Sequence, residues 1–115
     1  MIAVIFEVWP KDGHRAPYLD RAAALKAHLN DIPGFISVER FESLATPGKL
    51  LSLSFWTDED ALDHWRKLPE HRDAQSAGRD VHFDDYRLRV AGVIRDYGMT
   101  ARDQAPHDSR ALHDR

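Results

Sequence analysis

The chain has 115 residues, which is room for one domain. It carries 16 Lys and Arg against 19 Asp and Glu, and the basic residues are scattered, a pattern that argues against nucleic acid or an anionic membrane as partner. The absence of cysteine excludes disulfides, thiolate metal ligands and a cysteine nucleophile. The apolar start is too short for a membrane span and lacks the pattern of a signal peptide, so we expect a cytoplasmic protein.

The first two elements are predicted to be a strand and a helix. Residues Ile2 to Trp9 are rich in β-branched and aromatic types and stop at a proline, which indicates a strand. A helix is predicted from Pro17 to about Asn30, because apolar residues recur there at steps of four, three and four. Its apolar stripe consists of Tyr18, Ala22, Leu25 and Leu29. The Pro33-Gly34 pair ends it.

Two further strands follow, from Phe35 to Leu44 and from Lys49 to Trp56. The short Thr-Pro-Gly connection between them predicts an antiparallel hairpin. In the first of these strands, alternation places Phe35, Ser37, Glu39 and Phe41 on one face, with Ile36, Val38, Arg40 and Glu42 on the other. In the second, Leu51, Leu53 and Phe55 face away from Ser52, Ser54 and Trp56.

A second helix is predicted after Thr57, which with Asp60 resembles a capping box. Its buried face consists of Ala61, Trp65 and Leu68. Pro69 interrupts this helix and opens a further short helix that Gly78 closes.

The last predicted strand runs from Asp85 to Tyr97, with Gly92 as a possible site of a bulge. Tyr86, Leu88 and Val90 alternate in it with Arg87 and Arg89. The sequence after Met99 is polar and without periodicity. We therefore predict a domain over residues 1–98 and a mobile tail over residues 99–115.

The order β-α-β-β-α-β predicts an α+β fold of the ferredoxin-like, split βαβ type, with a four-stranded antiparallel sheet and both helices on one face. The other face of the sheet then carries large apolar side chains. A second copy packed sheet to sheet would cover them, so we expect a homodimer.

Charged residues within the strands are expected to form structural ion pairs. Glu7 and Arg40 lie among apolar strand residues and are predicted to be a buried pair, because a lone buried charge is costly. Arg87 and Arg89 are predicted to pair with Glu39 or Glu42, across the sheet or across the dimer.

The candidate functional residues gather between Trp56 and Arg79. If the bend at Pro69 folds the two helical segments over one end of the sheet, Trp65, His71 and Gln75 can line one pocket. An indole wall, an imidazole that moves a proton and an amide that holds an oxygen suit a flat aromatic ligand. The alternatives remain open, since Trp65 also has core spacing and His71 also fits a surface position.

No metal site is predicted. His64 and His71 are seven residues apart, but Pro69 between them breaks the helical register and no carboxylate accompanies them at a regular spacing. The hydrolase, nucleotide-binding and metalloprotease motifs are also absent from the sequence.

Several short motifs together resemble the antibiotic biosynthesis monooxygenase family. They are Pro33-Gly34-Phe35, Val38-Glu39-Arg40-Phe41, Phe55-Trp56, Asp60 with Trp65, and His71-Arg72 with Ala74-Gln75. The resemblance runs from about Met1 to Tyr97 and implies a dimeric α+β barrel with a cavity in each subunit between sheet and helices.

The resemblance also implies an activity. Known members include cofactor-free oxygenases, in which O₂ attacks a deprotonated, electron-rich substrate, and haem-degrading oxygenases. In the first group His71 would accept the proton, and Trp65, Gln75, Phe6 and Trp56 would bind the substrate. In the second group the position of the axial histidine corresponds to Gln75, and the asparagine of the first strand is replaced by Phe6-Glu7. Haem is therefore possible but disfavoured.

Three hypotheses follow from the sequence. The first is a cofactor-independent monooxygenase, an oxidoreductase that acts with O₂ on a small aromatic or quinol-type molecule. The second is a haem-binding or haem-degrading protein. The third is a dimer without catalytic activity that only binds a ligand or serves in a stress response.

Overall fold

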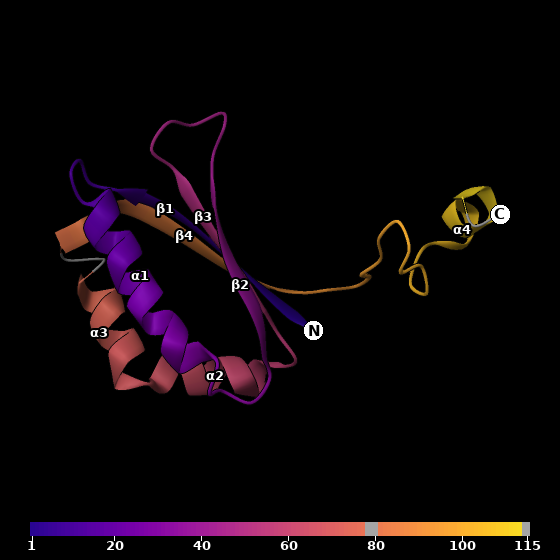
Figure 1. Ribbon diagram of the computed structural model, residues 1–115, viewed down its shortest axis with the longest axis horizontal. Coiled ribbons are helices and arrows are strands. Elements are labelled where there is room, and N and C mark those ends of the chain that lie inside the picture. Colours follow the sequence, from indigo (N-terminus) through magenta and orange to yellow (C-terminus); the bar gives the residue numbers. More distant parts are fainter. Residues whose placement is uncertain (78–80, 114–115) are drawn as a thin grey trace.

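The protein, seen in a computed structural model that describes residues 1–77 and 81–113, has the predicted β-α-β-β-α-β order (Figure 1). The elements are β1 (Ile2–Pro10), α1 (Arg15–Leu29), β2 (Phe35–Glu42), β3 (Leu50–Trp56), α2 (Glu59–Lys67), α3 (Pro69–Ala77), β4 (Phe83–Gly92) and α4 (His107–His113). The ferredoxin-like architecture is thereby confirmed.

The four strands form one antiparallel sheet in the order β2-β3-β1-β4. Gly92 was predicted as a possible bulge, and this was wrong, because Gly92 pairs in register with Ile2 and ends β4. The irregularity in this strand pair lies instead between Trp9 and Pro10. Proline has no N–H to donate to the ladder, which accounts for a break at that place.

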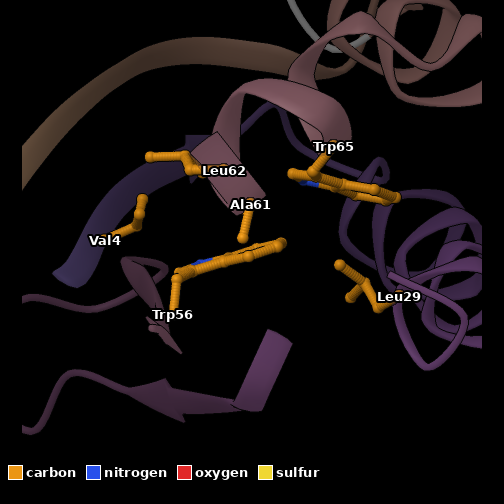
Figure 2. Close-up of a cluster of buried hydrophobic side chains, with 6 residues drawn as sticks. All are labelled: Val4, Leu29, Trp56, Ala61, Leu62 and Trp65. Carbon is orange, nitrogen blue, oxygen red and sulfur yellow. The ribbon is translucent and has the colours of Figure 1, made fainter. Parts of the chain in front are cut away.

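Helices α1, α2 and α3 all lie on one face of the sheet (Figure 1). The core between these layers centres on Trp56, which is 1% exposed. Figure 2 shows Ala61 of α2 above the Trp56 ring, with Trp65 and Leu29 beside it. The predicted apolar stripes of α1 and α2 thus point into the core, as their spacing required.

Strand β2 departs from simple alternation. Its register with β3 shifts between Phe35 and Ser37, so Ile36 is an extra residue in the strand. Phe35 therefore shares the helix-facing side with Val38, and both pack against the core, whereas Ile36 is exposed. The prediction that Phe35 and Val38 lie on opposite faces was wrong, because an inserted residue resets the alternation.

Gly34 lies where the chain leaves α1 and passes close to α2. Its φ of +91° is in the left-handed region, and a Cβ built on it would lie 2.5 Å from Oγ1 of Thr57 and 2.7 Å from Cβ of Ala61. The amide of Thr57 also donates to the Gly34 carbonyl at 2.8 Å. Only glycine satisfies both the backbone angle and this close approach.

The N-terminus of α2 is capped by Asp58, whose carboxylate accepts a hydrogen bond from the Ala61 amide at 2.9 Å. The sequence predicted that Thr57 caps this helix, and this was wrong, because the cap is the next residue, Asp58. Helix α2 then ends at Lys67, and α3 begins at Pro69, where a missing N–H costs nothing. The predicted closure of α3 at Gly78 lies outside the described residues.

The sheet face opposite the helices carries apolar side chains around an ion-pair cluster. Ile5 pairs with Leu53, and Phe55 follows on the same face of β3. Glu7, also on this face, pairs with both Lys49 and Arg89. Those side chains stabilise the ionised carboxylate, and the hydrogen bond from Lys49 contributes most to lowering the pKa of Glu7.

These contacts overturn two predictions within the chain. Glu7 does not pair with Arg40, because the two lie on opposite faces of the sheet. Arg89 pairs with Glu7 rather than with Glu39 or Glu42, and Glu42 binds Arg15 of α1 at 2.6 Å. Alternation within one strand does not show which strands are neighbours or how their faces correspond, and these decide which charges meet.

The chain leaves the sheet after β4 and runs away from the domain to α4 (Figure 1). Helix α4 was not predicted from the polar tail sequence. The tail packs on itself at Ala105, which is 7% exposed. None of the helices in the described part of the chain is long and apolar enough to cross a membrane.

Candidate functional site

A cavity of about 540 Å³ lies between the sheet and the three helices. This volume is within the range of small-molecule sites. All five residues singled out from the sequence line it: Phe6, Trp56, Trp65, His71 and Gln75. The structure therefore brings these residues together, while their roles in binding and catalysis remain predictions.

One end of the cavity is built by Trp65 of α2 and His71 of α3. Their ring centroids are 4.5 Å apart and their planes are inclined by 60°. The break at Pro69 makes this contact possible, because it turns α3 so that His71 comes back over Trp65. Trp65 also packs at 6.5 Å from Trp56, so it is both core and cavity wall. Trp65 thus has the core position that its spacing indicated and also lines the cavity, while binding of a ligand by Trp65 stays a prediction.

The imidazole of His71 is half-buried, and its Nδ1 has no hydrogen-bond partner. Burial is the main cause that lowers the pKa of His71 from 6.5 to about 4, and the positive charges of Arg66 and Arg72 act in the same direction. The ring is therefore neutral at physiological pH. A neutral imidazole with an unpaired nitrogen can accept a proton or a hydrogen bond from a ligand.

The other end of the cavity is aromatic. The ring centroid of Phe6 lies 5.9 Å from that of Phe83 and 5.7 Å from that of Tyr86. Tyr18 of α1 packs edge-on against Phe83, with 5.3 Å between the ring centroids. Tyr86 is 39% exposed and Leu88 is 47% exposed, so the cavity opens along β4. Such tilted rings suit the faces and edges of a flat apolar ligand.

Tyr18 and Arg40 also line the cavity, and sequence reasoning missed both as site residues. Burial raises the pKa of Tyr18, while the guanidinium of Arg40 beside its hydroxyl opposes that rise. The sequence predicted an ion pair between Arg40 and Glu7 and therefore gave Arg40 no role in a ligand site. Arg40 lies two residues after Val38, so alternation places both on the helix-facing side of the strand. This spacing was the signal that could have identified Arg40 as a cavity residue.

The polar groups of the floor come from β3. Ser54 accepts a hydrogen bond from Nε1 of Trp56 at 3.0 Å, which fixes the indole. Ser52 lies one step further along the same face. Gln75 is exposed at the rim of the cavity, on α3. In the described part of the chain, no cluster of three or more His, Cys, Asp or Glu side chains could hold a metal ion.

This geometry agrees with comparisons to known proteins. A profile of the family described as "Antibiotic biosynthesis monooxygenase" matches residues 1–77. The chain belongs to the antibiotic biosynthesis monooxygenase family. The family resemblance and the fold expected from the sequence are thereby confirmed.

Two relatives are similar over most of this chain. It is 47% identical over 93 residues to "Jasmonate monooxygenase ABM" of Pyricularia oryzae, a match that covers 81% of this chain and 43% of the relative. It is 36% identical over 93 residues to the Bacillus subtilis protein YqjZ, covering 81% and 79% of the two chains. The chain therefore spans less than half the length of the Pyricularia enzyme.

Solved structures share the fold at low sequence identity. SnoaB, a cofactor-independent oxygenase from Streptomyces nogalater, superposes with a TM-score of 0.71 and 16% identity over 83% of this chain and 94% of SnoaB. Rv0793 from Mycobacterium tuberculosis gives a TM-score of 0.75 and 18% identity over 84% of this chain and 98% of Rv0793. At this identity the likeness concerns the fold.

Proposed function

We propose that this member of the family is a cofactor-independent monooxygenase that binds a small aromatic or quinol-type molecule in the cavity. The observation that carries the proposal is the contact between Trp65 and His71 inside an apolar cavity, with Nδ1 of His71 unpaired. The names of the Pyricularia relative and of SnoaB, a monooxygenase and a cofactor-independent oxygenase, support the same reaction class.

His71 acts as the proton acceptor in this proposal. Burial in the cavity holds the imidazole neutral, and a substrate O–H or activated C–H placed beside Nδ1 can transfer its proton to the ring. The substrate anion then lies next to the imidazolium, and this opposite charge raises the pKa of His71 again. The low pKa of His71 therefore does not prevent proton transfer.

The substrate anion supplies the electrons that O₂ requires. It transfers one electron to O₂, and the two radicals combine to a substrate peroxide, which takes up the proton. Loss of water from a peroxide at a CH₂ carbon then leaves a carbonyl, so that CH₂ and O₂ become C=O and H₂O. The aromatic walls exclude bulk water and hold the anion in place during these steps.

Haem is the alternative cofactor that the family resemblance raises, and the residues do not fit it well. By the family resemblance, Gln75 corresponds to the axial histidine of haem-degrading members, and an amide is not among the usual axial ligands. The His71 ring packs against Trp65. We therefore propose that the reaction needs no haem. A Soret shift on titration of the protein with hemin, lost in His71→Ala, would contradict this.

Oxygen uptake tests the proposed activity directly. The protein is supplied with anthrones and hydroquinones, and O₂ consumption is followed with an electrode. We expect His71→Ala to lower kcat at least about tenfold, within the usual range for loss of a general base. His64→Ala is the matched control, because His64 is exposed on α2 outside the cavity. Ligand-induced thermal shifts without any O₂ uptake would favour the binding protein without catalytic activity.

The working unit is proposed to be a homodimer in the cytoplasm. The apolar face around Ile5, Leu53 and Phe55 is the surface that a second sheet would cover. The central charges of that face, Glu7, Lys49 and Arg89, satisfy one another within the chain, which lowers the cost of burying them. Light scattering and cell fractionation test the two parts of this proposal.

A further inference from the structure

Arg40 is a cation that the fold places inside the cavity. Its strand partner on β3 is Ser52, and Ser52 pairs in turn with Phe6 of β1. Residues directly opposite each other in neighbouring strands point to the same face of a sheet. Arg40, Ser52 and Phe6 therefore form one row of the cavity floor, which agrees with all three lining the cavity.

Arg40 differs from the cations of the neighbouring ion pairs in having no acidic partner among the described residues. Arg89 and Lys49 bind Glu7, and Arg15 binds Glu42. Arg40 forms no ion pair with any described residue, and its Nε is buried without a hydrogen-bond acceptor. Leaving a buried donor of a charged group unpaired is costly. A fold tolerates such a group where a ligand supplies the acceptor.

The charged residues of the cavity wall also favour an anionic ligand. None of the described residues that line it is acidic, while Arg21 and Arg72 stand exposed at its rim in addition to Arg40. The remaining wall is mostly apolar and aromatic. A neutral apolar ligand would leave the buried Nε unsatisfied, whereas an amphipathic anion satisfies it and covers the aromatic rings at the same time.

We propose that Arg40, together with the hydroxyl of Tyr18, binds a carboxylate or similar anionic group of an amphipathic substrate. This inference rests on the proposed function, which it deepens by naming the charge of the substrate. The hydroxyl of Tyr18 lies beside the Arg40 guanidinium and can donate to the same anionic group. An arginine fork and a phenol together provide the donors that the oxygens of a carboxylate accept.

The position of this anchor also sets the length of the substrate. Trp65 contacts Trp56, whereas Arg40 pairs with Ser52, four residues further back along β3. Four residues of extended strand span about 13 Å. The anionic group would therefore be bound several bonds away from the carbon that reacts at the Trp65–His71 end. The anchor holds the substrate without neutralising the reacting anion.

Two dyes with the same ring system test this inference by binding alone. 8-Anilinonaphthalene-1-sulfonate carries one sulfonate, and N-phenyl-1-naphthylamine is the same molecule without it. Both become fluorescent in an apolar site, so each is titrated into the wild-type protein, Arg40→Gln, Arg40→Lys and Tyr18→Phe. Arg87→Gln is the control, because Arg87 lies on β4 and does not line the cavity.

We expect Arg40→Gln to weaken binding of the sulfonate dye at least about tenfold, the usual size of a lost charge-assisted hydrogen bond. Binding of the neutral dye should change less than about twofold. Arg40→Lys should retain most of the preference for the anion, and Tyr18→Phe should lose part of it. Arg87→Gln should behave as the wild type. The proposal is overturned if Arg40→Gln weakens both dyes equally, which would indicate a structural role, or weakens neither.

The anion site and the proposed oxygenase activity can be contradicted independently of each other. Loss of the anion preference in Arg40→Gln together with an absence of O₂ uptake from every anthrone and hydroquinone supplied would retain the anion site and contradict the oxygenase. Turnover of neutral hydroquinones by a protein in which Arg40→Gln changes nothing would retain the oxygenase and contradict the anion site.

Discussion

The imidazole of His71 packs edge-on against the indole of Trp65, with 4.5 Å between the ring centroids, although the two rings come from different helices, α3 and α2. The contact places the only cavity histidine of α3 against a residue that also belongs to the core. It links the protonation state of the site to the stability of the fold.

Stability should therefore fall in acid through His71. The folded-state pKa of about 4 lies below the ordinary 6.5, so between these values the unfolded chain binds a proton that the folded chain does not. The free energy of unfolding then decreases as the pH falls from about 6.5 toward about 4, by up to ~3 kcal/mol from this residue. In His71→Gln this part of the decrease should vanish.

Urea unfolding at pH 7, 6, 5 and 4.5 measures this effect. His64→Gln on the exposed side of α2 serves as the control and should follow the wild type. Curves of the free energy of unfolding against pH that run parallel for wild type and His71→Gln would contradict the prediction.

Gly34 is expected to tolerate no side chain. Gly34→Ala combines a φ of +91° with contacts of 2.5 Å to Thr57 and 2.7 Å to Ala61, so we expect a loss of more than about 2 kcal/mol in the free energy of unfolding. Gly48→Ala is the matched control. It has a similar φ of +81° but open space around the new Cβ, and should cost only about 1 kcal/mol. Equal losses in the two variants would argue against the close approach.

Capping of α2 should depend on Asp58. Asp58→Ala removes the hydrogen bond to the Ala61 amide and should lower the free energy of unfolding by about 1 kcal/mol. Thr57→Ala should cost less, since the Thr57 side chain is not the cap. Chemical denaturation of both variants distinguishes the two residues, and a larger loss in Thr57→Ala would restore the assignment made from the sequence.

The open sheet face should govern association. Leu53→Glu introduces a charge at the centre of that face, beside Ile5, and should convert the proposed dimer to a monomer. Leu44→Glu is the control, because Leu44 is fully exposed in the turn between β2 and β3. Light scattering after gel filtration measures the mass of each. A wild-type protein of monomer mass at 100 μM would contradict the dimer.

The sequence was sufficient to predict the elements whose position depends on residues close together along the chain. The spacing of Tyr18, Ala22, Leu25 and Leu29 defined α1, and Pro69 marked the boundary between α2 and α3. Trp65 and His71 were identified as candidate cavity residues because a bend at Pro69 can fold the two helical segments over one end of the sheet. These inferences need only neighbours along the chain.

The errors that affect the sheet and the cavity concern relationships between strands. The extra residue at Ile36 is invisible in the alternating pattern of β2, because each half of the strand alternates correctly on its own. The pairing of Glu7 with Arg89 depends on β1 lying between β3 and β4, which no local pattern specifies. Arg40 was therefore misassigned, and with it the cation beside Tyr18 in the cavity was missed.

The shared membership of Trp56 and Trp65 in core and cavity has a consequence for how specificity can diverge in this fold. A mutation of either indole that admits a new ligand also weakens the packing that keeps the chain folded. Three other residues line the cavity without belonging to the central core cluster: Tyr18, Arg40 and Phe83. New substrate preferences are accordingly easier to evolve at that end, while the indole end stays fixed and keeps the reaction chemistry constant.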